Sequence, residues 1–332
     1  MTPAPRFLSG IQPSGQLHLG NYFGAIRQHL EAQEAGNSFY FIANYHALTT
    51  VENPDLLRQN TFDVAATYLA LGLDPERATL FCQSDVPEVT ELLWLLLPVT
   101  GMGLLERAVS YKDKVAKGLP ASAGLFTYPV LMAADILAYD STIVPVGKDQ
   151  VQHVEMAQDL AQAFNYRYGA HSRRRGDGKI FTIPTYRLSQ SPWVPGLDGG
   201  KMSKSYNNTI PIFAEGKALA SLVARIKTDG TPLAAPKDPD TCNVFALYSL
   251  FASDLEQAEL RARYLGGGYG YGDAKKELVK KIDERFADAR KRRAAADANP
   301  SRVREVLAEG GRRARAVARE VTDRAREACG VA

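Results

Sequence analysis

The chain has 332 residues, of which 45% are hydrophobic and 23% are charged, and its formal net charge is +3. These values are ordinary for a folded globular protein and exclude a fibrous or intrinsically disordered chain. The longest apolar run, Leu92–Val99, contains Pro98 and is far shorter than the ~18 residues that a membrane span requires. The first residues lack the basic and then apolar pattern of a secretory signal, so we expect a cytoplasmic protein with no membrane attachment.

Cysteine and histidine spacing argues against a structural metal. The three cysteines are widely separated and form no Cys-x-x-Cys pair, and the five histidines form no His-x-x-x-His pair. We therefore expect reduced thiols and no protein-bound structural metal.

Short apolar segments alternate with helical patterns in the first part of the chain. Strands are predicted over residues 6–11, 38–43 and 78–83, and helices over 17–35 and 54–71. Alternation of this kind predicts the α/β class, here a Rossmann-like, doubly wound parallel sheet with helices on its faces.

A helical insert of about residues 86–140 interrupts this alternation. Its predicted helices are 88–97, 102–117 and 125–139, and a strand over 142–146 and a helix over 149–164 follow it. An exposed loop is expected over 172–177, which contains three consecutive arginines.

Beyond residue 211 the pattern becomes helical, with helices predicted over 215–227, 243–252, 274–293 and 300–327. We expect Gly310-Gly311 to kink or split the last helix. The change of pattern predicts two domains, a catalytic domain of residues 1–210 and an all-helical domain of residues 211–332.

Positive charge gathers near the carboxyl terminus. Residues 273–332 hold 17 lysines and arginines against 11 aspartates and glutamates. An excess of six positive charges is a modest argument for a polyanionic partner, and on charge alone a solvated helix face is the better explanation.

The segment Gly10-Ile11-Gln12-Pro13-Ser14-Gly15 follows the first predicted strand and leads to His18-Leu19-Gly20-Asn21. A glycine-containing loop between a strand and a helix lets the backbone approach a phosphate or ribose. An imidazole at the helix start can donate to an α-phosphate oxygen, and Gly20 leaves room for adenine.

A second motif, Lys201-Met202-Ser203-Lys204-Ser205, lies in a segment rich in proline and glycine, which suits a movable loop. Two lysines here supply positive charge for the β- and γ-phosphates of a nucleotide, with Ser203 and Ser205 as further donors. Either motif alone is weak evidence, because such segments are common in turns and on surfaces. Their order and separation point to adenylate chemistry.

These motifs resemble the two signatures of the class I aminoacyl-tRNA synthetases, with HLGN in place of HIGH and KMSKS in full. Within that class, the segments at residues 9–15, 127–137 and 144–150 resemble the bacterial tryptophanyl enzymes. The resemblance covers essentially the whole chain. It departs from the general pattern at Asn21, which replaces the final histidine of HIGH.

The resemblance implies an ATP site and a catalytic set. The catalytic residues would be His18, Lys201 and Lys204, with Mg²⁺ arriving with ATP as the cofactor. The ATP-binding residues implied are Gln12, Pro13, Ser14, Gly20, Asn21, Gly147, Lys148, Asp149, Val194, Lys201, Met202, Ser203, Lys204 and Ser205.

The resemblance also implies a tryptophan pocket. Met132 and Asp135 lie three residues apart and so share a helix face, which lets the thioether flank an indole ring while the carboxylate accepts its N–H. Tyr128 and Gln150 would bind the substrate ammonium group. The remaining pocket residues implied are His46, Val144 and Val146.

The reaction implied is activation of L-tryptophan by ATP, followed by transfer to tRNA(Trp) by a homodimer whose basic carboxyl-terminal helices contact the tRNA. Three alternatives remain open. A tyrosyl-tRNA synthetase shares the fold and both signatures. A non-tRNA adenylyltransferase of the superfamily would not need the helical domain after residue 210. A non-catalytic, synthetase-like tRNA-binding or regulatory protein would bind tRNA without charging it.

Overall fold

A single parallel sheet forms the centre of the protein. The structure is a computed structural model that describes residues 5–35, 37–108, 111–112, 122–171, 179–188 and 192–332. The strand order in the sheet is β3-β2-β1-β4-β5, and every neighbouring pair is parallel. The strands are β1 (Phe7–Ile11), β2 (Ser38–Ile42), β3 (Ala78–Cys82), β4 (Ile143–Val146) and β5 (Thr185–Leu188).

The strand order reverses beside β1. The chain runs outward from β1 through β2 to β3 and then returns to β4 on the other side of β1. The carboxyl ends of β1 and β4 therefore adjoin, and open α/β sheets bind ligands at such a reversal. Gln12 follows β1 and Gly147 follows β4, so both implied ATP residues lie at this edge of the sheet.

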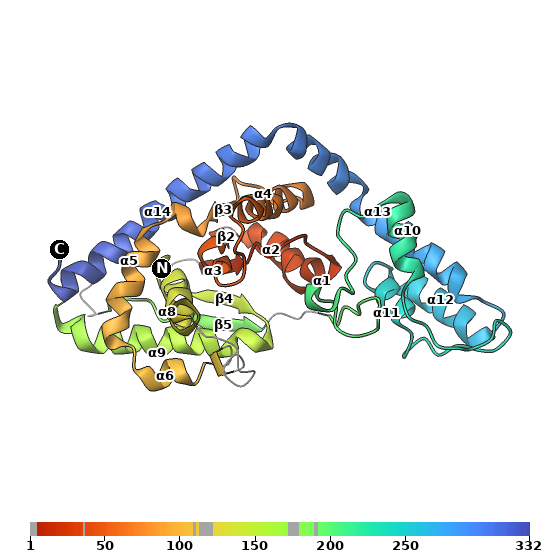
Figure 1. Cartoon of the computed structure of the whole chain (residues 1–332), viewed down its shortest axis with the longest axis horizontal. Helices are drawn as coiled ribbons and strands as arrows, with labels where there is room; N and C mark the ends of the chain where they lie inside the picture. Colours follow the sequence, from red (N-terminus) through yellow and green to blue (C-terminus); the bar gives the residue numbers. More distant parts are fainter. Residues whose placement is uncertain (1–4, 36, 109–110, 113–121, 172–178, 189–191) are drawn as a thin grey trace.

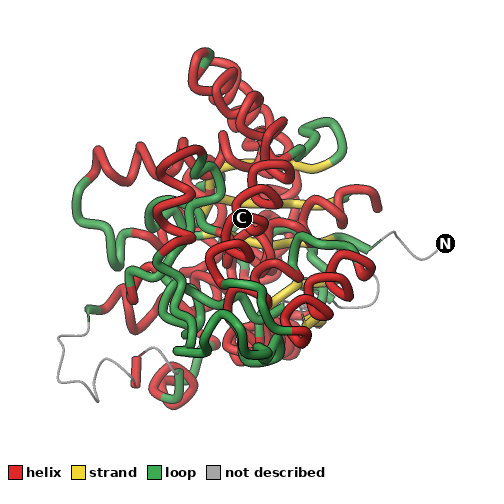
Figure 2. Tube along the Cα trace, turned by 90° about the vertical axis from the view of Figure 1, so that its right-hand side faces the viewer, coloured by secondary structure: helices red, strands yellow, loops and turns green. Residues whose placement is uncertain are grey.

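Helices cover both faces of the sheet (Figures 1 and 2). One hydrophobic core joins α4 to β2, β3 and the carboxyl-terminal helices. A second core joins α5, α8 and α9 to the opposite face. These elements confirm the predicted α/β fold with its helical insert. Among the described residues before position 172, the α-helices are α1 (Leu19–Asn21), α2 (Arg27–Ala32), α3 (Asn44–Ala47), α4 (Pro54–Leu71), α5 (Glu88–Leu96), α6 (Met102–Glu106), α8 (Ala123–Leu137) and α9 (Val151–Tyr168).

Helix α4 begins and ends where the sequence predicts. The Asn53 side chain caps it by accepting hydrogen bonds from the backbone N–H groups of Asp55 and Leu56, at 2.9 and 3.1 Å. Gly72 ends it with φ of 107°, a left-handed conformation that glycine adopts without steric cost. Both signals are local, which is why sequence alone locates them.

The predicted helix over 17–35 is not one regular α-helix. It begins as α1 at Leu19, continues as a π-helical stretch over Tyr22–Ile26 and becomes α-helical again in α2. The last three residues, Gln33–Ala35, form a 3₁₀ turn. π-Helical turns inside helices are frequent at functional sites, and this one directly follows the HLGN motif.

One further prediction needs correction, and two elements were not predicted. The helix expected over 102–117 ends at Glu106 in α6, and residues 113–117 lie outside the described residues. The arginine loop predicted over 172–177 also lies outside the described residues. Strand β5 was not predicted, because its four residues are all exposed and form an edge without an apolar pattern. Helix α12 (Asp254–Gly266) was also missed, although Ser253 and Glu256 form a capping box that marks its start.

A helical arm extends from the sheet region (Figure 1). It consists of α10 (Gly216–Ala224), α11 (Asn243–Ser249), α12 and most of α13 (Tyr271–Ala298). The last helix, α14 (Pro300–Cys329), returns along the sheet region, where it packs on β3 and α5. Residues after 210 therefore do not all lie in the arm, and the boundary near residue 210 stays a prediction.

Helix α14 runs unbroken through Gly310-Gly311, contrary to the predicted kink. A Cβ atom at Gly310 would lie 1.8 Å from the carbonyl oxygen of Leu80, and one at Gly311 would lie 2.9 Å from the Cβ of Asp85. The two glycines therefore serve close packing of α14 against β3 and the turn that follows it.

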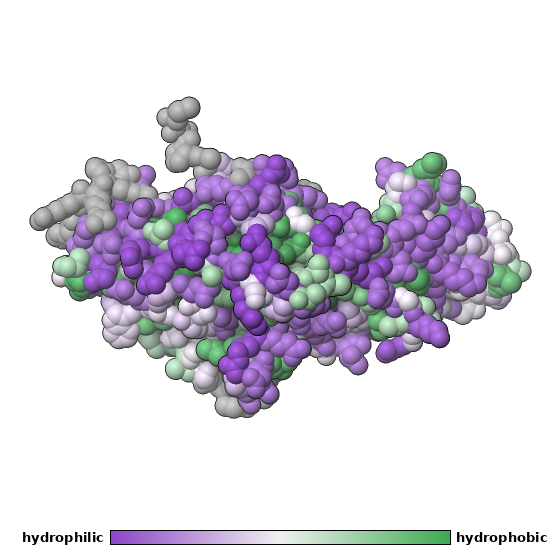
Figure 3. All heavy atoms as spheres, turned by 90° about the horizontal axis from the view of Figure 1, so that it is seen from above, coloured by the Kyte–Doolittle hydropathy of each residue, from purple (hydrophilic) through white to green (hydrophobic). Residues whose placement is uncertain are grey.

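Much of the basic charge in α14 is paired within the chain. Arg315 contacts Glu88 at 2.8 Å and Arg324 contacts Asp140 at 2.8 Å. The face that carries α13 and α14 is mainly hydrophilic (Figure 3).

Across the described residues, no helix combines the length and apolarity of a membrane span.

Candidate active site

The two signature motifs lie against each other. The Lys204 ammonium group donates to the carbonyl oxygen of Gly15 at 2.8 Å, and the Gly20 N–H donates to the Met202 sulfur at 3.3 Å. The backbone of Leu19 also donates to Ile210, at 3.0 Å. Residues about 190 positions apart in the chain thus form one continuous structure beside β1.

His18 occupies a buried position at the start of α1. Its side chain is 6% exposed, and its Nδ1 atom has no hydrogen-bond partner among the described residues. Burial, together with the nearby Lys204 charge, lowers the pKa of His18 to about 4. The imidazole is therefore neutral near pH 7, with one ring nitrogen as an N–H donor and the other as an acceptor.

Gly20 has a steric reason to be glycine, because a Cβ atom there would lie 2.9 Å from the His18 ring. Burial also lowers the pKa of Lys204, whereas Lys201 is exposed. The two lysines of the motif thus differ in environment, with Lys204 docked and Lys201 facing solvent.

Asn208 organises the KMSKS loop from within and is 2% exposed. Its side-chain oxygen accepts from the Ser203 N–H at 2.8 Å, and its amide nitrogen donates to Asp198 at 2.7 Å and to the Lys201 carbonyl at 3.1 Å. Sequence reasoning missed this residue. Val194, an implied ATP residue, is buried where its carbonyl accepts from the Met202 N–H at 3.0 Å.

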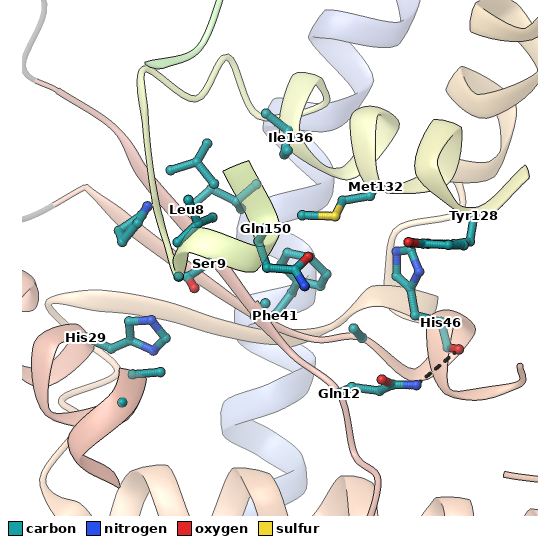
Figure 4. Close-up of a pocket in the computed structure, with 18 of the residues that line it drawn as sticks. Leu8, Ser9, Gln12, His29, Phe41, His46, Tyr128, Met132, Ile136 and Gln150 are labelled. Carbon is teal, nitrogen blue, oxygen red and sulfur yellow. Dashed lines mark hydrogen bonds between the residues drawn. The ribbon is translucent and has the colours of Figure 1, made fainter. Parts of the chain in front are cut away.

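A cavity of about 550 Å³ opens at the reversal of strand order, between β1, β4, α3 and α8. Figure 4 shows the Met132 thioether and the Gln150 side chain directed into the same space, with Tyr128 beside His46 at one end. Gln12 donates to the His46 carbonyl at 3.3 Å. The predicted site residues that line this cavity are Gln12, His46, Tyr128, Met132, Val144, Val146, Gly147 and Gln150.

Other predicted residues lie outside the cavity lining. Lys148, which follows Gly147, is exposed. The structure does not describe the side chain of Asp149. The predicted residues in and near the two signature motifs that do not line the cavity are Pro13, Ser14, His18, Gly20, Asn21, Val194, Lys201, Met202, Ser203, Lys204 and Ser205.

Asp135 lies behind the cavity wall. Its side chain is 1% exposed, and Oδ2 is 2.9 Å from Nε2 of His46, a residue that lines the cavity. Burial raises the pKa of Asp135, while hydrogen bonds from His46 and Gln83 oppose that rise. A direct hydrogen bond from an indole N–H to this carboxylate therefore requires a side-chain movement in the wall.

Tyr128 has a partner that the sequence did not predict. Its hydroxyl lies 2.5 Å from Nε2 of His153, which is buried in α9. The contact joins α8 to α9 and fixes the position of the phenol at the cavity. Among the described residues, no group of three histidine, cysteine, aspartate or glutamate side chains is arranged to hold a metal ion.

The family model "tRNA synthetases class I (W and Y)" matches residues 2–287. The chain belongs to this family. As a class I synthetase it carries both signatures, HLGN and KMSKS, at the reversal of strand order in its sheet.

Relatives within the family share nearly the whole chain. The tryptophan–tRNA ligase of Rhodopirellula baltica is 54% identical over 98% of this chain and 99% of its own length. That of Fusobacterium nucleatum is 51% identical over 98% of both chains. The crystal structure of the Campylobacter jejuni tryptophanyl-tRNA synthetase, complexed with ADP and tryptophan, is 49% identical, with a TM-score of 0.90 over 98% of this chain and 99% of its own.

Proposed function

We propose that this synthetase is a tryptophan–tRNA ligase. It activates L-tryptophan with ATP to tryptophanyl-adenylate and diphosphate, and then transfers the tryptophanyl group to tRNA(Trp) with release of AMP. The observation that carries the proposal is the 54% identity to a tryptophan–tRNA ligase over 98% of the chain. The cavity at the strand reversal supports it, since aromatic and apolar side chains dominate its walls.

In the proposed first step, the tryptophan carboxylate attacks the α-phosphorus and diphosphate leaves. No enzyme nucleophile is needed, so orientation and charge stabilisation supply the catalysis. Lys204 and Lys201 would hold the β- and γ-phosphates. The neutral His18 would donate a hydrogen bond to an α-phosphate oxygen through its ring N–H.

Side chains of the docked signature segments fit a triphosphate, because they present two ammonium groups and one imidazole. Mg²⁺ would be held by the phosphate oxygens of ATP and would neutralise their charge. Gln12, Gly147 and Asp149 would contact the adenosine part, together with the backbone of the loop after β1. The adenine contact of Val194 also remains a proposal.

The tryptophan would occupy the cavity, its ring between Met132 and the valines of β4. Its ammonium group would meet Tyr128 and Gln150, whose side chains border the same space (Figure 4). Its indole N–H would donate to the Asp135 carboxylate after a movement of the His46 side chain, which lines the cavity wall in front of Asp135. A buried carboxylate that demands an N–H donor rejects phenylalanine, because an unfilled acceptor loses its partner.

We also propose that tRNA(Trp) contacts the helical arm and that the protein acts as a homodimer in the cytoplasm. Exposed lysines on the arm, such as Lys217 on α10 and Lys280 on α13, suit phosphate contacts. Two large apolar side chains, Trp94 on α5 and Met102 on α6, are 69% and 62% exposed and would suit a subunit interface.

The test is aminoacylation of transcripts of tRNA(Trp) and tRNA(Tyr), with each amino acid supplied separately. We expect tryptophan to be attached to tRNA(Trp) alone. Attachment of tyrosine to tRNA(Tyr) would establish the tyrosyl alternative. Binding of tRNA(Trp) with no charging, by protein that is fully folded, would support the regulatory alternative.

A further inference from the structure

Gln83 joins Asp135 to the start of α3. It directly follows β3, its side chain is 0% exposed, and 52 positions separate it from Asp135. Its amide nitrogen donates to both carboxylate oxygens, at 2.9 Å to Oδ1 and 2.8 Å to Oδ2. Its amide oxygen accepts from the backbone N–H groups of Tyr45 and His46, at 3.0 and 3.4 Å.

The side-chain amide of Gln83 therefore uses both its oxygen and its nitrogen in hydrogen bonds. One end places the backbone that carries His46, and the other holds the carboxylate that the His46 ring also contacts. Oδ2 of Asp135 receives two donors and Oδ1 receives one. Each carboxylate oxygen can accept two hydrogen bonds, so among the described residues Oδ1 keeps the larger remaining acceptor capacity.

We propose that Gln83 is a positioning residue for amino-acid specificity, which holds the Asp135 carboxylate and His46 in the arrangement that accepts an indole N–H. This inference rests on the proposed function, because it concerns the recognition of tryptophan in the same cavity. Gln83 does not line the cavity, so it acts through its two partners and not by touching the substrate.

The chain offers a matched control in Gln33. It is 7% exposed, its amide nitrogen donates to the Gly72 carbonyl at 3.2 Å, and its amide oxygen accepts from the Asp74 N–H at 2.8 Å. Gln33→Met removes a buried glutamine that joins two segments, as Gln83→Met does, but leaves Asp135 untouched.

The experiment measures ATP–pyrophosphate exchange with L-tryptophan and with its benzothienyl analogue, in which sulfur replaces the indole N–H. The quantity compared is the ratio of the two kcat/KM values. We expect Gln83→Met to lower this ratio by roughly tenfold or more, the size of a lost hydrogen bond to a charged group. The loss should appear mainly in the KM for tryptophan, with the KM for ATP unchanged, and Gln33→Met should keep the wild-type ratio.

A second variant, Gln83→Glu, keeps the shape and the acceptor of the glutamine but places a carboxyl group against Asp135. We expect it to lower the ratio as well, so a Gln83→Met protein that fails to fold does not remove the test. A wild-type ratio in folded Gln83→Met or in Gln83→Glu would overturn the inference, as would an equal loss in Gln33→Met. Absence of tryptophan-dependent exchange in the wild type would instead contradict the proposed function.

Discussion

Lys204 joins the two signature segments through its bond to the Gly15 carbonyl. In the proposed reaction it exchanges this neutral partner for phosphate oxygens. We predict that Lys204→Ala slows adenylate formation by about 10²–10³-fold, the usual cost of removing one group that stabilises transition-state charge. Affinity for tryptophan should change little, because the amino-acid cavity does not include this residue.

Single-turnover measurement of adenylate formation, with tryptophan binding followed separately, checks this prediction. Lys179→Ala provides the control, since Lys179 is an exposed lysine outside both signature segments and outside the helical arm. An intact single-turnover rate in Lys204→Ala would contradict the assigned role.

Asp135 is the residue on which the proposed specificity depends. Asp135→Asn removes the charge but keeps the shape, so we predict a 10- to 100-fold loss in kcat/KM for tryptophan, roughly the value of a hydrogen bond to an ionised group. Discrimination against the benzothienyl analogue should fall at the same time. Steady-state exchange kinetics check this prediction, with a variant of an exposed aspartate, Asp159→Asn, as control. If Asp135→Asn discriminates between tryptophan and the analogue as the wild type does, then Asp135 is not the acceptor and His46 alone contacts the indole N–H.

Some of these residues could be predicted from the sequence and others could not. The cavity residues of α8 and β4 stand in segments that resemble the family, so their positions followed from the motif. Gln83 and Asn208 gave no such signal, because a glutamine after a strand and an asparagine in a loop are common. Their roles come from partners that only the folded chain brings close, as with Gln83 and Asp135.

At the scale of the elements, close approach of α14 to β3 depends on Gly310. We predict that Gly310→Ala lowers the free energy of unfolding by about 2–3 kcal/mol, because the added methyl group meets the Leu80 carbonyl oxygen and one of the two elements must shift. Gly272→Ala in α13 is the control, since nothing lies within 4 Å of a Cβ there. It should keep or slightly raise stability.

Urea unfolding of both variants checks this prediction. Equal stability of Gly310→Ala and the wild type would show that α14 does not pack tightly against β3 in solution. A loss in Gly272→Ala of the same size would show that helix propensity, and not contact with β3, determines the effect.

The elements themselves were predictable where the signals were local. Helix α4 has a cap, a proline in its first turn and a glycine at its end, and the prediction matched both boundaries. Strand β5 is exposed along its length, so no alternation marked it. We predicted a kink from Gly310-Gly311 because glycine weakens helices. The sequence alone does not show that the neighbouring strand β3 leaves no room for a side chain at Gly310.

At the scale of the whole molecule, acid should destabilise the fold through buried neutral histidines. Burial lowers the pKa of His29 to about 4 from its ordinary value of 6.5, and His18 shifts in the same direction. The unfolded chain then binds more protons than the folded one between pH 6.5 and 4. Stability is therefore fully present above pH 6.5 and falls as the pH drops towards 4.

We predict that the His29 contribution lost between pH 7 and pH 4.5 is about 2 kcal/mol. Urea unfolding at the two pH values, for the wild type and His29→Phe, measures it. The variant loses the hydrogen bond to the Tyr68 hydroxyl at both pH values, so only the difference between its two values is informative. That difference should be smaller than in the wild type, and equal differences would refute the assignment.

Side-chain contacts join the helical arm to Tyr22, the residue that follows the HLGN motif. The Arg285 guanidinium of α13 donates to the Tyr22 hydroxyl at 2.5 Å. The ring of Phe286 packs edge-on against the ring of Tyr22, with 5.0 Å between the two ring centroids. Tyr22 directly follows HLGN. The proposed tRNA-contacting arm therefore touches the π-helical stretch that follows α1. The HLGN segment and the arm thus belong to one connected structure.

The central claim is that this chain activates tryptophan in the cavity between β1 and β4. The most direct measurement is ATP–pyrophosphate exchange with purified protein, supplied separately with tryptophan, tyrosine and phenylalanine. The account predicts exchange that depends on tryptophan alone. Exchange with tyrosine would contradict the specificity, and no exchange with any of the three amino acids, in folded protein, would contradict the proposed activity itself.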